Sequence, residues 1–366
     1  MHIAIYLPSL RGGGAERAMV TLANGFADRG LKIDLVLAKA EGPYLSEVSP
    51  NVRVVDLQSS RVLASLPGLV HYLRRERPQA MLSALSHANI IAVTARMLAG
   101  VSVRLVVSER SNLSMSSRKP QNLRGRAVLP LMRWVYRKAD GVVAVSRGVA
   151  DDLSRTIGLP RDRVSVVYNP VVTSELIYKS RASLEHPWLG EGKPPVILGA
   201  GRLTHSKDFA TLIRAFAQVR TVHDCRLVIL GEGELRVELE QLIMSLGIAD
   251  SVQLPGFTEN PFAWMSRVRL FVLSSRWEGL PNVLIQAMAC GAAVVSTDCP
   301  SGPDEILEGG KWGKLAPVGD VKELASAMIA SLDTLCEQSP DVRRRARDFR
   351  QELAVDGYLK VFRVMS

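Results

Sequence analysis

The sequence predicts an α/β fold made of two Rossmann-like, doubly wound domains. The chain has 366 residues, a length that suits two domains of this class. Short apolar runs alternate with amphipathic stretches along the whole chain, which is typical of parallel sheets covered by helices. A polar, proline-rich stretch over 171–195 separates two such series. These observations favour two similar domains joined by a linker.

The first series opens with the apolar run Ile3–Leu7, which predicts a strand that Pro8 stops. A helix over Glu16–Ala27 and a strand over Lys32–Leu37 follow from the change of hydrophobic period. Further apolar runs predict strands at Ala80–Leu85, Arg104–Val107, Gly141–Val145 and Ser165–Val167.

The second series begins with a strand that opens at Val196 and repeats the pattern. Its later strands are predicted at Arg226–Leu230, Ser251–Leu254, Leu270–Leu273 and Ala293–Ser296. We therefore expect a first domain over 1–170, a linker over 171–195, a second domain over 196–345 and a C-terminal helix over 346–366 that packs back toward the first domain.

The charge of the chain is concentrated in its first half. Residues 1–170 hold 24 of the 46 basic residues and only 12 of the 36 acidic ones. This excess predicts an acidic partner for the first domain, such as nucleic acid, anionic lipid or a phosphate-bearing substrate.

The four cysteines show no CxxC spacing and no Asp-x-Asp triplet occurs, so we expect no metal site. The opening strand lacks a basic signal-peptide start, and we expect a cytoplasmic protein.

The segment from Ser274 to Gly291 carries the most specific chemistry in the chain. After the buried strand 270–273, a polar turn presents Glu278 beside a glycine. Pro281 suits the first position of a helix that Gly291 is placed to end. A strand, a turn and a helix N-terminus form an anion site, because free backbone N–H groups point outward there. A carboxylate beside such a site suits a nucleotide sugar, which has phosphates at one end and hydroxyls at the other.

This segment resembles the signature of the GT4 family of retaining glycosyltransferases, which have the GT-B fold. The family pattern E-G-x-x-N-x-x-x-E-A-x-A-x-G matches at Glu278, Gly279 and Asn282, but Gln286 stands where the family has its second glutamate. The run 296–306 resembles a subgroup that builds bacterial surface polysaccharides. The resemblance covers nearly the whole chain and implies two domains that face each other across a cleft.

Two further loops match the family and imply a donor site. The loop with Gly13 and Gly14 resembles the family's G-G-A-E-R loop, which borders the donor phosphates. The turn Gly201–Lys207 resembles its G-R-L-x-x-x-K turn, in which the cations contact the diphosphate. Fixed cations stabilise the negative charge that develops on a departing nucleoside diphosphate. The resemblance assigns catalytic roles to Glu278, Arg202 and Lys207. It assigns donor binding to Gly13, Gly14, Gly201, Arg202, Lys207, Gly279, Leu280, Asn282 and Gln286.

Candidates on the acceptor side follow two strand ends. His87 lies in a loop after one strand, where α/β proteins place ligands. In several family members a histidine of the next loop approaches the transferred sugar, but that loop here reads Ser108-Glu109-Arg110 and has no histidine. Either Glu109 takes part of that role or His87 does, and the candidates on the acceptor side are His87, Glu109 and Arg110. An isolated loop histidine is more often a solvated surface group, and Glu109 with Arg110 could form a simple local ion pair.

The stretch 118–147 holds eight basic residues against one acid, Asp140. Within it Val128, Leu131, Trp134 and Val135 are expected on one helical face. Basic side chains beside an apolar stripe suit the surface of an anionic membrane. The alternative is a helix that packs into the domain and exposes a basic face.

The sequence thus predicts a metal-independent hexosyltransferase without a cofactor. Its substrates would be a nucleotide sugar, UDP-linked, and a lipid-linked or membrane-associated glycan acceptor for surface polysaccharide or glycoconjugate assembly. It would attach peripherally to the inner face of the cytoplasmic membrane and bind no nucleic acid. The alternatives are another GT-B enzyme, such as a nucleotide-sugar epimerase, and a basic nucleic-acid-binding protein without enzymatic activity.

Overall fold

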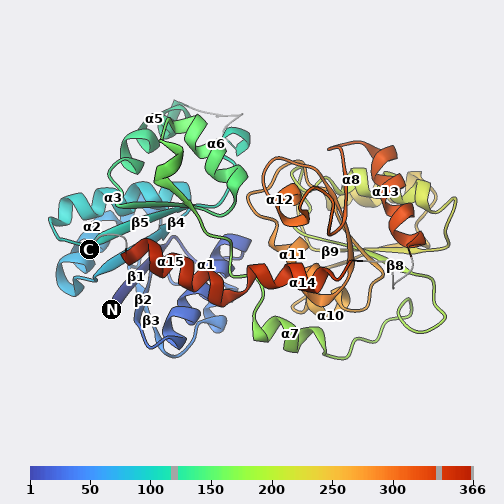
Figure 1. Ribbon diagram of the computed structural model, residues 1–366, viewed down its shortest axis with the longest axis horizontal. Coiled ribbons are helices and arrows are strands. Elements are labelled where there is room, and N and C mark those ends of the chain that lie inside the picture. Colours follow the sequence, from blue (N-terminus) through green and yellow to red (C-terminus); the bar gives the residue numbers. More distant parts are fainter. Residues whose placement is uncertain (117–122, 335–339, 364–366) are drawn as a thin grey trace. The chain divides into compact units, whose positions relative to one another are not determined.

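The structure, a computed structural model, describes residues 1–116, 123–334 and 340–363. The chain forms two compact units: unit 1 comprises Met1–Val171 and Gln351–Ser366, and unit 2 comprises Val172–Arg350. Unit 1 contains a seven-stranded sheet and unit 2 a six-stranded sheet, and every strand pair is parallel (Figure 1). The prediction of two doubly wound α/β domains is confirmed.

Unit 1 has the strand order β3-β2-β1-β4-β5-β6-β7, so the winding direction reverses between β1 and β4. Its strands are β1 His2–Leu7, β2 Lys32–Leu37, β3 Val52–Asp56, β4 Ala80–Ala84, β5 Arg104–Glu109, β6 Gly141–Ala144 and β7 Val164–Val166. Its helices are α1 Gly14–Asp28, α2 Leu66–Glu76, α3 Ser86–Ala99, α4 Leu113–Ser116, α5 Leu123–Tyr136, α6 Arg147–Ile157 and α15 Gln351–Arg363, with 3-10 turns η1 Pro43–Glu47, η2 Val62–Ser65 and η3 Arg161–Arg163. Ligands of such sheets bind at the carboxyl ends of the strands, near the reversal.

Helix α15 completes the core of unit 1, although it comes last in the chain. It lies beside α1 on one face of the sheet, while α2, α3 and α5 cover the other face (Figure 1). Phe362 of α15 contacts the Phe26 ring of α1 at a centroid distance of 6.0 Å. Gln351 donates a hydrogen bond from Nε2 to the Thr21 carbonyl oxygen at 2.7 Å. The C-terminal helix is therefore a structural part of unit 1.

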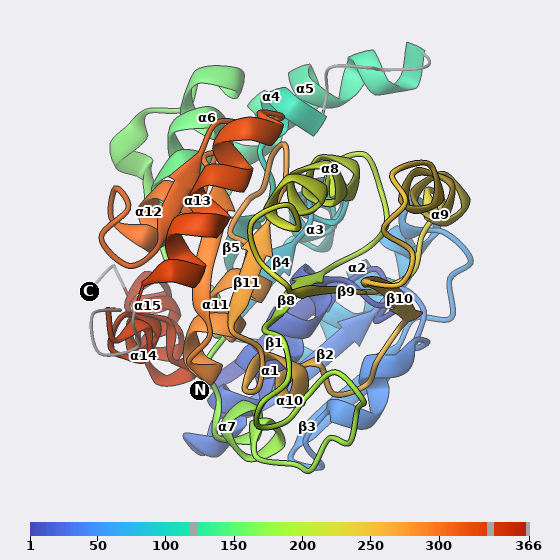
Figure 2. The same cartoon turned by 90° about the vertical axis from the view of Figure 1, so that its right-hand side faces the viewer.

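Unit 2 has the strand order β10-β9-β8-β11-β12-β13. Its strands are β8 Val196–Ala200, β9 Arg226–Leu230, β10 Val252–Gly256, β11 Leu270–Leu273, β12 Ala293–Thr297 and β13 Lys314–Ala316. Its helices are α7 Ser174–Ser180, α8 Phe209–Val219, α9 Arg236–Ser245, α10 Pro261–Met265, α11 Asn282–Cys290, α12 Pro303–Leu307, α13 Val321–Asp333 and α14 Val342–Ala346, with a 3-10 turn η5 Arg347–Phe349. Helices α8 and α13 pack together on one side of this sheet (Figure 2).

The structure adds elements that the apolar pattern did not predict. Strands β3 and β13 form edges of the two sheets, and α7 lies within the segment predicted as a linker. That segment packs on unit 2, because Asn260 and Ser266 donate hydrogen bonds to the carbonyl oxygens of Lys179 and Ser180. In the described part of the chain, no helix combines the length and hydropathy needed to cross a bilayer.

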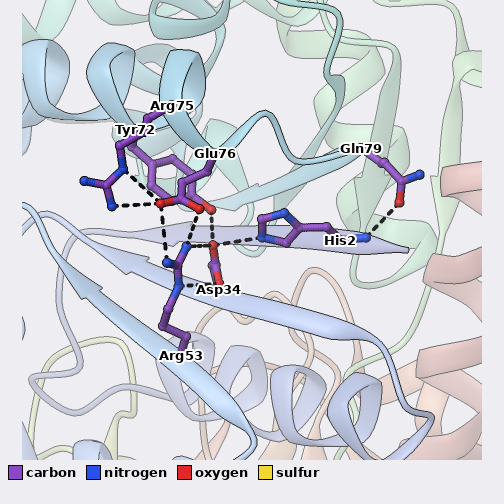
Figure 3. Close-up of polar contacts among 7 residues, drawn as sticks. All are labelled: His2, Asp34, Arg53, Tyr72, Arg75, Glu76 and Gln79. Atoms are coloured by element: carbon purple, nitrogen blue, oxygen red, sulfur yellow. Dashed lines mark hydrogen bonds and ion pairs between the residues drawn. The ribbon is translucent and has the colours of Figure 1, made fainter.

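A buried carboxylate ties three strands and a helix of unit 1 together (Figure 3). Asp34 of β2 is completely buried and accepts hydrogen bonds from His2 Nε2 at 2.8 Å, Arg53 Nε at 2.8 Å and Tyr72 OH at 2.6 Å. Glu76, one turn further along α2, pairs with the same Arg53 at 3.0 Å. Burial works to raise the pKa of Asp34, but the hydrogen bonds from Arg53, Tyr72 and His2 outweigh it and hold this pKa below its usual value.

We predict that Asp34→Asn lowers the free energy of unfolding by about 2 kcal/mol at pH 7, because an amide loses charged hydrogen bonds while Arg53 stays in place. A carboxyl with a lowered folded-state pKa stabilises the fold above its unfolded pKa, and this stabilisation is lost as pH falls through the folded pKa. Urea unfolding between pH 7 and pH 3 should therefore show a weaker acid dependence in the variant. The exposed Asp28→Asn is the control, and equal acid dependence in all three proteins would contradict the prediction.

Candidate functional site

Two loops of unit 2 meet at the carboxyl edge of its sheet. Strands β8 and β11 are neighbours, with Leu270 opposite Ile197 and Phe271 opposite Leu198. The loop after β8 therefore lies beside the loop after β11. Arg276 N–H donates a hydrogen bond to the Ser206 carbonyl oxygen at 2.8 Å, and Ser274 Oγ donates one to the Lys207 carbonyl oxygen at 2.7 Å. These contacts hold the Gly201–Lys207 turn against the segment that contains Glu278.

Glycines of a third loop let the backbone approach the Gly201–Lys207 turn closely. Gly231 has φ +133°, and a Cβ atom there would overlap the carbonyl oxygen of Gly201. A Cβ atom at Gly233 would overlap the Leu203 carbonyl group in the same way. Leu203 N–H donates to the Glu232 carbonyl oxygen at 2.9 Å, which joins the two loops. The Gly231-Glu232-Gly233 turn therefore supports the loop that follows β8.

The structure brings two of the predicted catalytic residues into direct contact. Lys207 Nζ forms an ion pair with Glu278 Oε1, and the two side chains are 22% and 12% exposed. Ser275 Oγ donates a hydrogen bond to the same carboxylate oxygen at 2.7 Å. Arg202, the other predicted cation, is exposed at the rim of the same turn. The sequence predicted separate ligand groups for Lys207 and Glu278, and it gave no signal that they pair with each other.

A second ion pair, which the sequence analysis missed, shapes the start of α8. Asp208 is buried and adopts the left-handed conformation, with φ +47°, directly before that helix. Arg276 Nε donates to its carboxylate at 2.9 Å. This bond joins the end of the β8 loop to the start of the Glu278 loop. Arg276 stands two residues before Glu278, a spacing that could have drawn attention to it.

The helix that follows Glu278 begins one residue later than expected. Pro281 occupies the N-cap position with a non-helical backbone, and Asn282 is the first residue of α11. Gly291 ends the helix with φ +95°, as predicted. Leu280 is buried, while Gln286 is half-buried on the helix. The predicted donor-binding residues of unit 2 thus occupy two adjacent loops and the first turns of one helix.

The acceptor-side candidates lie at the carboxyl edge of the other sheet, in unit 1. Gly13 and Gly14, which the resemblance assigns to donor binding, lie at the same edge: Gly13 caps α1 and Gly14 is its first residue, at the end of the loop that follows β1. His87 is in the first turn of α3, and Glu109 is the last residue of β5, which adjoins β4. Burial lowers the pKa of His87, and Glu16 of α1 acts against this effect. The structure therefore gathers these predicted residues along neighbouring strand ends.

Glu109 is the centre of a buried polar network. It accepts hydrogen bonds from Tyr136 OH at 2.8 Å, Ser86 Oγ at 3.1 Å, Ser111 Oγ at 3.3 Å and the Arg110 backbone N–H at 3.1 Å. Burial raises the pKa of Glu109, against the effect of these hydrogen bonds. No ion pair between Glu109 and the Arg110 guanidinium occurs in the described ranges, so the local pair considered from the sequence is not observed.

The basic stretch of unit 1 has its apolar residues on both sides of helix α5. Leu131 and Trp134 are 43% and 48% exposed, whereas Val135 is completely buried. Arg133 is exposed near the end of this helix, and Arg137 and Lys138 are exposed in the turn that follows it. Arg118 and Lys119 lie outside the described residues, as do the side chains of Arg124, Arg126 and Val128. The expected single apolar face is therefore divided into a buried part and an exposed part.

The described cysteines are buried thiols away from any metal-binding group. Burial raises the pKa of Cys290 and of Cys299 to about 12, and that of Cys225 to about 11. Within the residues that the structure covers, no group of three His, Cys, Asp or Glu side chains is arranged to hold a metal ion.

Comparisons with known proteins match both units. The family model described as Glycosyl transferases group 1 matches residues 194–334, and the model described as Glycosyltransferase Family 4 matches residues 12–175. The chain is 32% identical to N-acetylgalactosamine-N,N'-diacetylbacillosaminyl-diphospho-undecaprenol 4-alpha-N-acetylgalactosaminyltransferase of Campylobacter jejuni, over 98% of this chain and 96% of that protein. It is 27% identical to the lipopolysaccharide core biosynthesis glycosyltransferase LpsE of Rhizobium meliloti, over 95% of each.

Solved structures share the fold. The crystal structure of HepE from Anabaena, in complex with UDP and glucose, superimposes with a TM-score of 0.79 at 22% identity and covers 98% of each chain. The sucrose-phosphate synthase of Thermosynechococcus elongatus gives a TM-score of 0.81 at 20% identity, over 99% of this chain and 98% of that one. At these identities the likeness shows the GT-B fold.

We predict that Gly231→Ala lowers the free energy of unfolding by about 3 kcal/mol, because its methyl group would both overlap the Gly201 carbonyl and strain a left-handed backbone. Gly247→Ala provides the matched control, since Gly247 also has a positive φ, +67°, but faces open space. The control should lose about 1 kcal/mol. Urea unfolding measures both, and equal losses would show that the close approach to Gly201 is unimportant.

Proposed function

The chain belongs to the glycosyltransferases of group 1 and family 4, and from this membership we propose a specific reaction. The protein transfers a sugar, with retention of anomeric configuration, from a UDP-linked donor to a lipid-linked or membrane-associated glycan acceptor. The observation that carries this proposal is the contact of Lys207 with Glu278 at a strand-loop-helix edge built for anions. UDP is the nucleotide in the HepE complex, and the Campylobacter relative acts on a diphospho-undecaprenol substrate.

The chemistry of the donor site follows from the charges in the two loops. Departure of a nucleoside diphosphate builds negative charge on its phosphate oxygens, which preorganised cations stabilise. Lys207 is already placed by Glu278, and Arg202 adds a guanidinium on the same turn. When the diphosphate binds, Lys207 exchanges its carboxylate partner for phosphate. Glu278 is then available to accept hydrogen bonds from sugar hydroxyls. The backbone N–H groups around 279–282 assist, and no metal ion is required.

The membrane-facing part of the proposal rests on α5. An exposed Trp134 and Leu131 beside three exposed cations suit the boundary between lipid headgroups and acyl chains. The relatives that assemble lipid-linked or lipopolysaccharide glycans support an acceptor held at a membrane. We infer peripheral attachment of unit 1 to the cytoplasmic leaflet and a role in surface polysaccharide or glycoconjugate assembly.

The reaction can be tested by incubating the protein with UDP-sugars and a membrane lipid extract, followed by mass spectrometry of the glycolipid. We predict that Lys207→Ala or Arg202→Ala lowers turnover about 10²-fold, the scale expected for losing one preorganised donor to a developing charge. Turnover should persist in EDTA. Circular dichroism confirms that the variants are folded, and full activity in both would contradict the diphosphate assignment.

Position 286 allows a second prediction, because Gln286 replaces the family's glutamate. Glutamine accepts from one ribose hydroxyl and donates to the other, whereas glutamate accepts from both as an anion. Gln286→Glu should therefore lower KM for the donor several-fold and leave kcat within a small factor. Glu278→Gln should lower kcat strongly, yet bind UDP more tightly, because Lys207 is no longer held by a carboxylate. Loss of all activity in Gln286→Glu would show that this residue does not contact the ribose.

Membrane attachment is predicted to be electrostatic. The protein should sediment with anionic liposomes but not with zwitterionic ones, and less so as salt rises, because exposed charges are screened. The double substitution Arg137→Glu and Lys138→Glu should release the protein from anionic liposomes. The control Arg344→Glu, which changes an exposed residue of unit 2, should leave liposome binding intact. Binding that persists at high salt, or that survives the double substitution, would count against this mode of attachment.

A further inference from the structure

Arg110 presents a buried positive charge that the protein satisfies only in part. It follows β5 directly, and its residue is 9% exposed. Its Nη2 donates a hydrogen bond to Asn169 Oδ1 at 2.6 Å. Its Nε and Nη1 are buried and have no hydrogen-bond partner among the described residues. A guanidinium carries five N–H donors and stays protonated, so three donors of a buried cation remain open. Such a group is costly to bury unless an anion compensates it.

The neighbouring acids do not supply that anion in direct contact with the guanidinium. Glu109 precedes Arg110 in sequence, but its carboxylate is occupied by Tyr136, Ser86, Ser111 and a backbone N–H. Burial lowers the pKa of Arg110, and it outweighs the effects of Tyr358 of α15, Glu16 of α1 and Glu109, which act on the guanidinium electrostatically, and of a side-chain hydrogen bond with Tyr358. In the part of the chain that the structure describes, neither Glu16 nor Glu109 forms an ion pair with the guanidinium. These groups compensate the guanidinium only in part, and its Nε and Nη1 donors stay available for an anion from outside the chain.

Oxygen atoms of a phosphate group match what Arg110 leaves open. The planar guanidinium binds two phosphate oxygens at once, which a point charge such as lysine cannot reproduce. Arg110 also stands at the carboxyl edge of a doubly wound sheet, close to where the winding reverses, and ligands of such sheets bind there. Unit 2 already carries Arg202 and Lys207 for the donor diphosphate, so a second phosphate-binding cation in unit 1 suits the other substrate.

We propose that Arg110 binds a phosphate group of the glycan acceptor and thereby selects acceptors in which a phosphate lies near the accepting sugar. This inference deepens the proposed function and rests on it in one respect: the proposed function identifies the phosphate-bearing molecule as the glycan acceptor. The oxyanion site itself is independent of that function. Arg110 holds the acceptor by its phosphate end, and Asn169 orients the guanidinium for that contact.

The experiment measures binding of inorganic pyrophosphate by isothermal titration calorimetry in the full chain. The background carries Arg202→Ala and Lys207→Ala, which removes the phosphate-binding cations of unit 2. Adding Arg110→Gln should weaken pyrophosphate about tenfold or more, the scale of a lost charge-assisted contact. Arg110→Lys should fall in between. Arg104→Gln, at the other end of β5, is the matched control and should change nothing, because Arg104 is satisfied by the Val361 carbonyl oxygen.

Thermal unfolding separates binding from a structural role. Without ligand, Arg110→Gln should melt at the same temperature as its background or higher, because an incompletely paired buried charge has been removed. A marked fall in melting temperature, or unchanged affinity for pyrophosphate, would overturn the proposal. In the wild-type background, UDP should bind equally well with and without Arg110→Gln. A matching loss of UDP affinity would assign the phosphate to the donor and overturn the acceptor assignment.

These results distinguish the two levels of inference. If the wild-type protein binds no UDP, the proposed donor is wrong, while an Arg110-dependent pyrophosphate site would still stand. If UDP binds and the affinity for pyrophosphate does not change when Arg110 is substituted, the donor proposal stands and the acceptor-phosphate inference fails.

Discussion

Parallel strand pairing is the constraint on which the rest of this structure depends. Because every pair in both sheets is parallel, all carboxyl ends of a sheet meet at one edge, and all the loops that carry chemistry emerge there. The register of β8 against β11 brings the Gly201–Lys207 turn beside Glu278, across a sequence distance of 71 residues. The close glycine contacts of Gly231 and Gly233 then secure that turn from its other side. The position of Lys207 beside Glu278 is thus determined by backbone pairing.

The Lys207–Glu278 pair shows one way in which a mostly buried charge is stabilised at this edge. The two opposite charges neutralise each other. Arg110 represents the opposite condition, since its charge is buried with donors left open. Under the proposed function, Lys207 would exchange its carboxylate partner when the diphosphate binds, whereas Arg110 would gain a partner without losing one.

The sequence predicted the central strands well because their two buried faces give uninterrupted apolar runs, as in β1 and β11. It did not predict β3 and β13, which are short edge strands with exposed charged residues. Helix α7 was missed because only Leu176 of its seven residues is buried, within a polar segment. The sequence located the motif loops after their strands, but it did not predict which side chains pair there. Lys207 with Glu278, and Arg276 with Asp208, depend on strand register, which a local pattern does not contain.

The discontinuity of unit 1 has a consequence for how the protein is made. The chain leaves unit 1 after Val171 and returns at Gln351, and at this crossing Val172 N–H donates to the Phe349 carbonyl oxygen at 3.0 Å. Tyr358 and Phe362 of α15 belong to the hydrophobic core built on β1 and α1. A ribosome must therefore synthesise all of unit 2 before the first unit can close its core. The domain that begins synthesis first is the last to finish folding, and until then the apolar face of α1 needs protection from aggregation.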